Sequence, residues 1–157
     1  MPILNSRIEG KNRNGDVIPA PDTLLSLGPV IPVTLTLSDE AQKAYVERGE
    51  SPPAGVSGFA MIDTGATATC IDIDAANQAG LPTVGAARMT SASHANQNVP
   101  TFAGKIVGPP INIDVEAGMG ANLSAFGSNL IVLLGRDLLQ SAVFIYNGPD
   151  GHFSIAI

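Results

Sequence analysis

Apolar and polar residues alternate along much of this chain with a period of two. Between residues 30 and 37, the apolar Val33, Leu35 and Leu37 stand at every second position, with threonines between them. This spacing predicts a strand with one buried face. Comparable alternating or fully apolar runs cover residues 57–62, 69–73, 86–91, 100–107, 111–116, 130–134, 143–146 and 153–157. Many short strands separated by turn residues are typical of an all-β domain.

Short helices are expected between some of these strands. Ser38 followed by acidic residues is a signal for a helix start, and Gly49 is a signal for its end. A second short helix is expected over residues 74–79, and a single helical turn over residues 138–141. Residues 143–157 are expected to close the chain as a hairpin. The fold class predicted from the pattern is therefore all-β with one or two short helices.

Composition adds that the chain forms one domain with a sizeable core. It has 157 residues, of which 45% are hydrophobic and 14% are charged. This balance argues against disorder, and the length is typical of a single domain. Residues 1–30 hold a polar turn cluster and three prolines, so we expect an arm or an irregular segment there. The domain itself is expected over residues 31–157.

The net charge and the remaining composition exclude several classes of binding partner. The net charge of −6 argues against nucleic acid or an anionic membrane surface as the main partner. No apolar run approaches the roughly 20 residues needed to cross a bilayer, so membrane insertion is not expected. The single cysteine excludes an internal disulfide. The first residues lack the basic-then-apolar layout of a signal peptide, which favours a cytoplasmic location.

Two short blocks carry the candidate chemistry. The apolar run at residues 59–62 leads directly into Asp63, and small residues follow it. A carboxylate at the end of a buried strand is costly unless it is hydrogen-bonded or has a chemical role. About seventy residues later, the apolar run at 130–134 ends in Gly135, Arg136 and Asp137.

Together these blocks resemble the retropepsins, the retroviral-type aspartic proteases. The resemblance covers roughly Pro32 to the C-terminus and implies a closed, barrel-like protomer. It also implies hydrolysis of internal peptide bonds in a polypeptide substrate. The reaction would use a water held between two carboxylates, and it requires no metal, nucleotide or other cofactor. Two like charges about 3 Å apart cannot both ionise, so one carboxyl group would stay protonated and the other would activate the water.

The chain contains only one Asp-Thr-Gly sequence, at residues 63–65, and no Asp-Ser-Gly. The second carboxylate would therefore have to come from Asp63 of a second copy, which makes a homodimer a requirement of the mechanism. By resemblance, Thr64 would hydrogen-bond across the two-fold axis. Gly65 would let the backbone approach the carboxylates, with its N–H donating to one of them. A hydroxyl at position 66 would stabilise the ionised carboxylate, so Ala66 predicts activity reaching toward neutral pH.

The second block has one departure from the retroviral pattern. In the retroviral enzymes the arginine at the position of Arg136 pairs with an acid four residues beyond the catalytic one, and here that residue is Thr67. Arg136 must then bond to Thr67, to backbone carbonyls, or to another acid such as Asp72 or Asp137. The two apolar residues before Gly135 are expected to let this segment pass closely beside the Asp63 loop.

Other positions are assigned by their place in the resembling pattern. Residues 38–57 stand where the compact retroviral enzymes have a short hairpin loop, so we expect an insertion there. The polar stretch around residues 92–98 stands at the position of the flap that closes over the peptide. We expect the flap tip to include Ser93, His94, Ala95, Asn96 and Gln97. Apolar residues such as Val84, Met89 and Ile106 are candidates for the walls of substrate pockets.

Several alternatives remain to be weighed against this hypothesis. The first is a catalytically silent module on the same fold that dimerises or binds peptides. Actin-like ATPases also use an Asp-x-Gly-x-Thr loop, but they need two α/β lobes that 157 residues cannot supply. A thiol enzyme would need Cys70 with a histidine, His94 or His152. A lone cysteine in an apolar run is more often packing, and three scattered residues do not suggest a metal site. The pair Asp72 and Asp74 is expected to cap the helix that follows.

Overall fold

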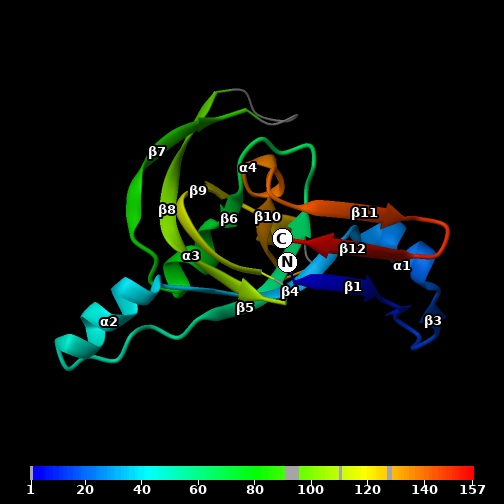
Figure 1. The fold of residues 1–157 in the computed structure, drawn as a ribbon, viewed down its shortest axis with the longest axis horizontal. Coiled ribbons are helices and arrows are strands. Elements are labelled where there is room, and N and C mark those ends of the chain that lie inside the picture. Colours follow the sequence, from blue (N-terminus) through cyan, green and yellow to red (C-terminus); the bar gives the residue numbers. More distant parts are fainter. Residues whose placement is uncertain (1, 91–95, 110, 127–128) are drawn as a thin grey trace.

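The computed structural model of the protein describes residues 2–90, 96–109, 111–126 and 129–157, and strands are its main regular element (Figure 1). The strands are β1 (Ile3–Arg7), β2 (Gly10–Lys11), β3 (Val17–Ile18), β4 (Val30–Thr36), β5 (Val56–Ile62), β6 (Cys70–Asp72), β7 (Thr83–Met89), β8 (Gln97–Gly108), β9 (Ile111–Ala121), β10 (Leu130–Leu134), β11 (Val143–Asn147) and β12 (His152–Ala156). The helices are α1 (Ala20–Leu27), α2 (Asp39–Glu47), α3 (Ile73–Gln78), α4 (Arg136–Leu139) and the 3₁₀ turn η1 (Ser124–Phe126). No helix among the described residues is long and apolar enough to cross a membrane.

Six strands form a closed barrel, in the order β4, β5, β10, β6, β9 and β8. The ring closes because β4 pairs with β8 as well as with β5, with Leu35 opposite Ile106. The strands β5 and β10 run parallel, as do β6 and β9, and the other neighbours in the barrel are antiparallel. The remaining strand of this sheet, β7, pairs with β8 outside the ring. The prediction of an all-β, closed barrel-like fold is confirmed, although the described residues contain four short α-helices where one or two were expected.

The core fills the barrel with the alternating residues that the pattern predicted to be buried. Along β4, Ile31, Val33 and Leu35 are buried, and Leu37 follows them inward. The largest fully buried side chains come from every barrel strand except β5, from β12 of the C-terminal hairpin, and from the residue before β6. They are Phe102, Phe153, Ile31, Leu35, Ile71, Ile106, Ile111, Leu134, Ile155, Val132 and Thr69. Burial of this apolar surface is the main stabilising contribution to the barrel.

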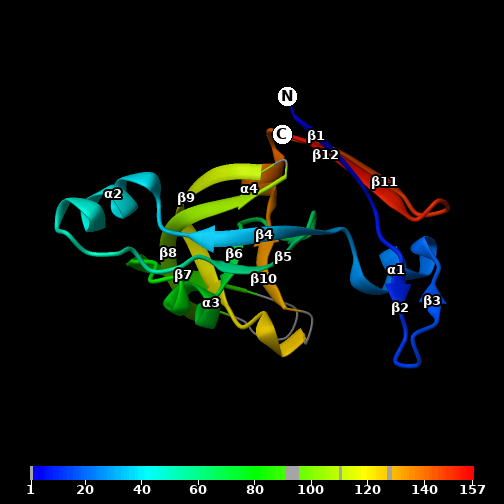
Figure 2. The same cartoon turned by 90° about the horizontal axis from the view of Figure 1, so that it is seen from below.

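The N-terminal residues are more regular than the sequence indicated. Strand β1 pairs with β12, which pairs with β11, so the two ends of the chain share a three-stranded sheet (Figures 1 and 2). The expected C-terminal hairpin is thus present. Helix α1 lies within the segment where an arm or an irregular segment was expected, and Pro21 does not prevent it. Pro21 lies in the first turn of that helix, where the missing N–H is not needed and φ is already suitable.

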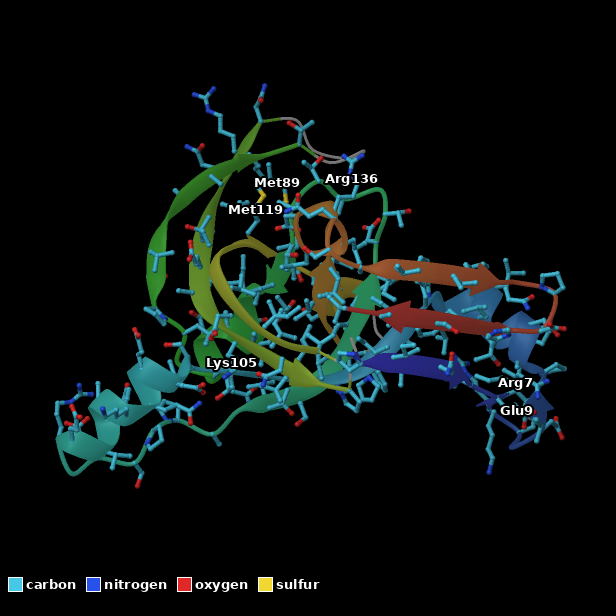
Figure 3. All side chains as sticks on the ribbon, viewed as in Figure 1. Arg7, Glu9, Met89, Lys105, Met119 and Arg136 are labelled. Atoms are coloured by element: carbon cyan, nitrogen blue, oxygen red, sulfur yellow. The ribbon has the colours of Figure 1, made fainter. Side chains whose placement is uncertain are left out.

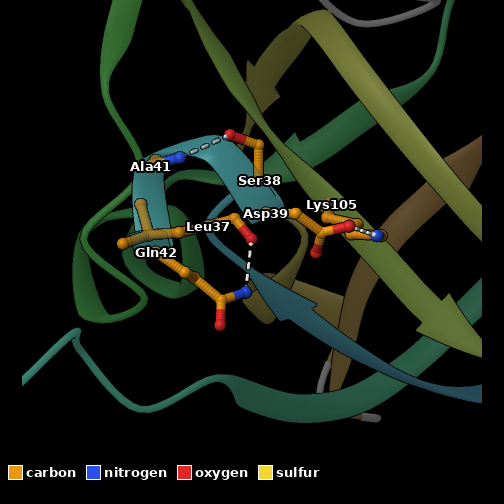
Figure 4. A network of polar contacts seen from close by, with 6 residues as sticks. All are labelled: Leu37, Ser38, Asp39, Ala41, Gln42 and Lys105. Carbon is orange, nitrogen blue, oxygen red and sulfur yellow. Dashed lines mark hydrogen bonds and ion pairs between the residues drawn. The ribbon is translucent and has the colours of Figure 1, made fainter. Parts of the chain in front are cut away.

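Helix α2 lies inside the segment expected to be an insertion and begins where the sequence predicted. Ser38 caps it by accepting a hydrogen bond from the backbone N–H of Ala41 (Figure 4). Gln42 donates to the carbonyl of Leu37, and Lys105 of β8 forms an ion pair with Asp39. This hydrogen-bonded pair raises the pKa of the Lys105 ammonium. The first two contacts fix the start of α2 to the residues that follow β4, and the ion pair attaches its first turn to β8 of the barrel.

Asp72 is the cap of α3, as predicted, and it also holds a second segment. Its Oδ1 accepts from the backbone N–H of Ala75 at 3.0 Å. Its Oδ2 accepts from the backbone N–H groups of Leu123 and Ser124, each at 2.9 Å. Asp72 is only 3% exposed, so these bonds are what makes its burial tolerable. Because both oxygens are engaged, Asp72 belongs to the scaffold between β6 and η1.

Candidate active site

Asp63 directly follows β5, and the backbone holds it there. Its N–H donates to the carbonyl of Leu134 at 3.0 Å, which extends the parallel pairing of β5 with β10 by one residue. Its carboxylate Oδ1 accepts from the N–H of Gly65 at 2.9 Å and of Ala66 at 3.2 Å. The half-buried carboxylate is therefore positioned by two amides of its own turn.

Gly65 has a steric reason to be glycine. A Cβ at this position would lie 3.1 Å from Oδ1 of Asp63, at the tight end of real contacts. The resemblance implied a close approach here and a hydrogen bond from the Gly65 N–H to a carboxylate, and within one chain that N–H donates to Oδ1 of Asp63. In this turn the chain thus presents a carboxylate with its backbone donors already in place.

The two sequence blocks meet at the start of α4. The N–H of Arg136 donates to the carbonyl of Ala66 at 3.0 Å, and the N–H of Asp137 donates to the carbonyl of Thr67 at 3.2 Å. At Gly135 the backbones are almost in contact, because a Cβ there would lie 2.4 Å from the carbonyl carbon of Ala68. The start of α4 is thereby fastened to the Asp63 turn.

Asp137 adds a second contact between the blocks, through Thr69, a residue that was not among the expected site residues. Its Oδ2 accepts from the N–H of Thr69 at 2.9 Å, and its Oδ1 accepts from the Thr69 hydroxyl at 2.8 Å. The same hydroxyl oxygen accepts from the N–H of Gly135 at 3.2 Å. Thr69 is 1% exposed, so its hydroxyl forms a buried bridge between the two blocks. The only sequence signal for it was a hydroxyl residue at the start of an apolar run.

The partner of Arg136 is Thr67. The guanidinium Nη2 donates to the Thr67 hydroxyl oxygen at 2.9 Å. Of the partners that the sequence left open, Asp137 is engaged with Thr69 and Asp72 with α3 and η1. A neutral hydroxyl thus stands where the retroviral pattern has an acid.

Apolar side chains surround the base of this site. A small cluster is centred on buried residues of β6, β9 and β10, with Met61, Met89, Met119 and Leu133 packed against it. Figure 3 shows Met89 and Met119 at the same end of the molecule as Arg136. Of the expected pocket residues, Met89 belongs to this cluster and Val84 is exposed on β7. The expectation for Ile106 was wrong, because its side chain is fully buried in the barrel core.

The expected flap lies between β7 and β8 in the sequence. Ser93, His94 and Ala95 lie outside the residues that the structure describes. Asn96 has a left-handed backbone with φ of 54°, and its N–H donates to the Thr90 hydroxyl at 3.4 Å. Gln97 begins β8 opposite Met89. A flap at these residues stays a prediction.

The thiol alternative requires a reactive Cys70, and a metal site requires grouped ligand side chains. Cys70 is a buried free cysteine, and burial, followed by the negative charges of Asp137 and Asp63, raises the pKa of its thiol. A reactive thiolate is therefore disfavoured at this position. His152 lies in β12, and His94 is outside the described residues. Within the described ranges, no three His, Cys, Asp or Glu side chains are grouped so that they could hold a metal ion.

A known protein family matches the part of the chain that contains Asp63 and the block at residues 135–137. The family model described as "gag-polyprotein putative aspartyl protease" matches residues 54–141, a range that contains both blocks. Among solved structures, the chain is similar to a retropepsin-like aspartic protease from Rickettsia conorii, at 15% identity and a TM-score of 0.45. That match covers 98% of this chain and 92% of the other. None of the curated proteins matches.

Proposed function

Because the chain belongs to the retropepsin-like family of gag-polyprotein putative aspartyl proteases, we propose that it is an aspartic endopeptidase that acts as a homodimer. Each copy would contribute Asp63, and the two carboxylates would activate one water between them. The substrate would be an extended polypeptide that forms strand-like hydrogen bonds with the walls of the cleft.

One observation carries this proposal. The chain has a single Asp-Thr-Gly turn, and that turn holds its carboxylate by the N–H groups of Gly65 and Ala66. Within the described part of the chain, the second oxygen of Asp63 accepts no hydrogen bond. One copy therefore offers half of a two-carboxylate site, and a two-fold axis beside Asp63 would complete it.

The chemistry follows from a shared proton. Two adjacent carboxyl groups retain one proton between them, because both cannot carry charge at that separation. The ionised group takes a proton from water as the water oxygen bonds to the carbonyl carbon of the substrate. The protonated group donates to the carbonyl oxygen. The tetrahedral intermediate then collapses: the C–N bond breaks, the nitrogen takes up a proton, and a carboxylic acid and an amine result.

The neighbouring residues would act by positioning. Thr64 is exposed and forms no side-chain hydrogen bond within the described part of its own chain, so its hydroxyl is available to a partner copy. Gly65 and Ala66 orient the carboxylate. Arg136 and Asp137 would keep the turn rigid, because each binds a threonine beyond it. Rigid support of this kind is what a catalytic pair needs if the two carboxylates are to stay aligned.

The decisive experiment replaces Asp63 by asparagine, which keeps the shape of the side chain and removes its charge. We expect Asp63→Asn to abolish cleavage of a peptide library, while Asp114→Asn, an exposed control on β9, leaves it intact. Cleavage that persists in purified Asp63→Asn protein would contradict the proposal. Binding of peptides without any cleavage by the wild type would favour the catalytically silent module.

A mixing experiment tests the homodimer separately. If each copy supplies one carboxylate, a large excess of Asp63→Asn protein draws wild-type chains into mixed dimers that lack one of them. Activity per wild-type chain should then fall as the excess grows. If Thr64 forms a hydrogen bond across the axis, the Asp63→Asn, Thr64→Ala double variant should form mixed dimers less well and should therefore inhibit less. Activity that is independent of the added variant, together with a monomer in sedimentation, would exclude the shared site.

A further inference from the structure

A groove of about 520 Å³ lies between α1 and the outer face of β5 and β10. Figure 2 shows α1 to one side of these two strands. Its walls are almost entirely apolar, and no charged side chain lines it. The main contributors are Ile8, Leu25, Leu27, Phe59, Met61 and Leu130.

The side chains around the groove include several that a folded protein would ordinarily cover. Leu25 is 81% exposed, Leu27 is 46% exposed and Phe59 is 37% exposed. Helix α1 buries a different set of residues, Ala20, Thr23 and Leu24, against the rest of the chain. Single exposed apolar residues are common, but several gathered around one concave surface are typical of a binding site.

The α1 wall is held in place from both of its ends. At its start, a Cβ on Gly151 would lie 2.2 Å from the carbonyl carbon of Ala20, so the β11–β12 turn and α1 are in backbone contact. At its end, Gly28 has φ of +74°, and a Cβ there would lie 2.9 Å from the sulfur of Met61. Between them, the Thr23 hydroxyl accepts from the N–H of Gly10 at 2.9 Å. The groove is therefore formed in advance, which lowers the entropic cost of binding.

The groove adjoins the strand that carries the candidate catalytic residue. Phe59 and Met61 are the outward-facing residues of β5, and Asp63 is the next position in that alternation. Leu130 of β10 lies opposite Phe59 in the parallel pair. An extended chain lying over Asp63 would thus have the groove within reach of its neighbouring side chains.

We propose that this groove binds a bulky apolar side chain of the polypeptide substrate, and that Leu25 and Leu27 on α1 determine which side chain is accepted. The inference rests on the proposed protease function and adds a specificity site formed by the N-terminal segment of this chain. The volume lies within the range of about 300–1,000 Å³ usual for ligand pockets. An uncharged occupant is favoured because the apolar lining offers no compensation for a buried charge.

The test uses Met61 as a reporter in protein that cannot cleave. The Asp63→Asn variant, with its methionine methyl groups labelled with ¹³C, is titrated with a polar peptide containing one phenylalanine and with the same peptide carrying alanine instead. We expect a saturable shift of the Met61 methyl resonance with the phenylalanine peptide only. Leu27→Lys should weaken that binding by at least about tenfold, since it places a charge at the groove. Val46→Lys is the matched control, because Val46 is also an exposed apolar residue near the end of a helix.

The outcomes separate this inference from the proposed function. Binding that is unaffected by Leu27→Lys, or a Met61 resonance that does not respond, would overturn the groove as a binding site whether or not the wild type cleaves. A Met61 resonance that changes with protein concentration alone, and stops changing in Leu27→Lys, would overturn it in favour of a second copy on this face. A responding Met61 in a protein whose wild type cleaves nothing would sustain the groove and refute the protease.

Discussion

Arg136 and Thr67 are joined by a hydrogen bond of 2.9 Å between the guanidinium Nη2 and the threonine hydroxyl oxygen, across 69 residues of sequence. The bond is exposed, and it links α4 to the turn that follows Asp63. In place of the ion pair of the retroviral pattern, the charged guanidinium here meets a neutral hydroxyl at the surface, so the energetic contribution of the bond should be modest and little affected by salt.

Removing the Thr67 hydroxyl tests that contribution. We expect Thr67→Val to lower the free energy of unfolding by about 0.5–1.5 kcal/mol, since one hydrogen bond to a charged group is lost at the surface. Thr67→Asp should restore or slightly exceed wild-type stability, by about 0–1 kcal/mol, through an exposed ion pair. Urea denaturation of the wild type and the two variants, at low and at high salt, measures both stability changes. Equal stability of Thr67→Val and wild type would show that the bond contributes nothing.

Gly135 is predicted to tolerate no side chain. A Cβ at this position would lie 2.4 Å from the carbonyl carbon of Ala68 and 2.7 Å from the nitrogen of Thr69, and backbone atoms cannot move aside cheaply. We expect Gly135→Ala to destabilise the protein by at least about 2 kcal/mol and to lower activity with it. Gly148→Ala is the control, because its Cβ would meet only an ordinary contact at 3.4 Å. Thermal unfolding of both variants gives the comparison, and a small effect at 135 would contradict the close approach.

Asp137 is predicted to stabilise the site through Thr69. In Asp137→Asn, an amide group replaces one of the two oxygens that accept from the N–H and the hydroxyl of Thr69. A buried donor then loses its acceptor, so we expect a loss of about 1–3 kcal/mol in unfolding free energy. Glu116→Gln removes the same charge from an exposed position on β9 and should change stability by less than about 0.5 kcal/mol. Chemical denaturation at neutral pH distinguishes them, and matching losses would argue for a general charge effect.

Cys70 predicts a loss of stability at alkaline pH. Burial raises the pKa of its thiol in the folded protein above the ordinary value of about 8.5, whereas in the unfolded chain the thiol ionises near that value. Above this pH the unfolded state binds fewer protons than the native state, so the free energy of unfolding falls as pH rises. Cys70→Ala should lack this component. The free energy of unfolding of both proteins is measured by denaturation between neutral and alkaline pH. We expect it to fall more steeply with pH in the wild type than in Cys70→Ala. Parallel curves for the two proteins would refute this prediction.

Ala66 predicts the position of the acid limb of the pH–rate profile. Its side chain has no hydroxyl, and the donors found on the Asp63 carboxylate are the N–H groups of residues 65 and 66. In Ala66→Ser, an added hydroxyl donor would stabilise the ionised form, so activity should persist to lower pH than in the wild type. Measuring kcat against pH for both proteins tests this. A wild-type profile that peaks sharply below about pH 4 would contradict the argument.

Local patterns in the sequence determined a large part of this structure. The alternation around Val33 and Leu35 predicted a strand with a buried face, because a period of two always places such residues on one side. Ser38 and Asp72 predicted helix starts, because a side-chain oxygen there satisfies a free N–H within a few residues. The tight turn after Asp63 is likewise local, because the N–H groups of Gly65 and Ala66 bind the side chain two and three residues before them. In each case the interacting groups are close in sequence.

The tertiary structure alone decided the contacts between distant segments. Closure of the barrel by β4 and β8, the pairing of β1 with β12, and the choice of Thr67 as the partner of Arg136 each depend on where remote segments meet. No local pattern encodes that choice, since several acceptors were available to Arg136 and all were chemically suitable. The α1 wall of the groove arose in the same way, because its position is set by contacts with the β11–β12 turn and with Met61. Residue type determined what could form a bond or a turn, and the packing of the whole chain determined which partners came within reach.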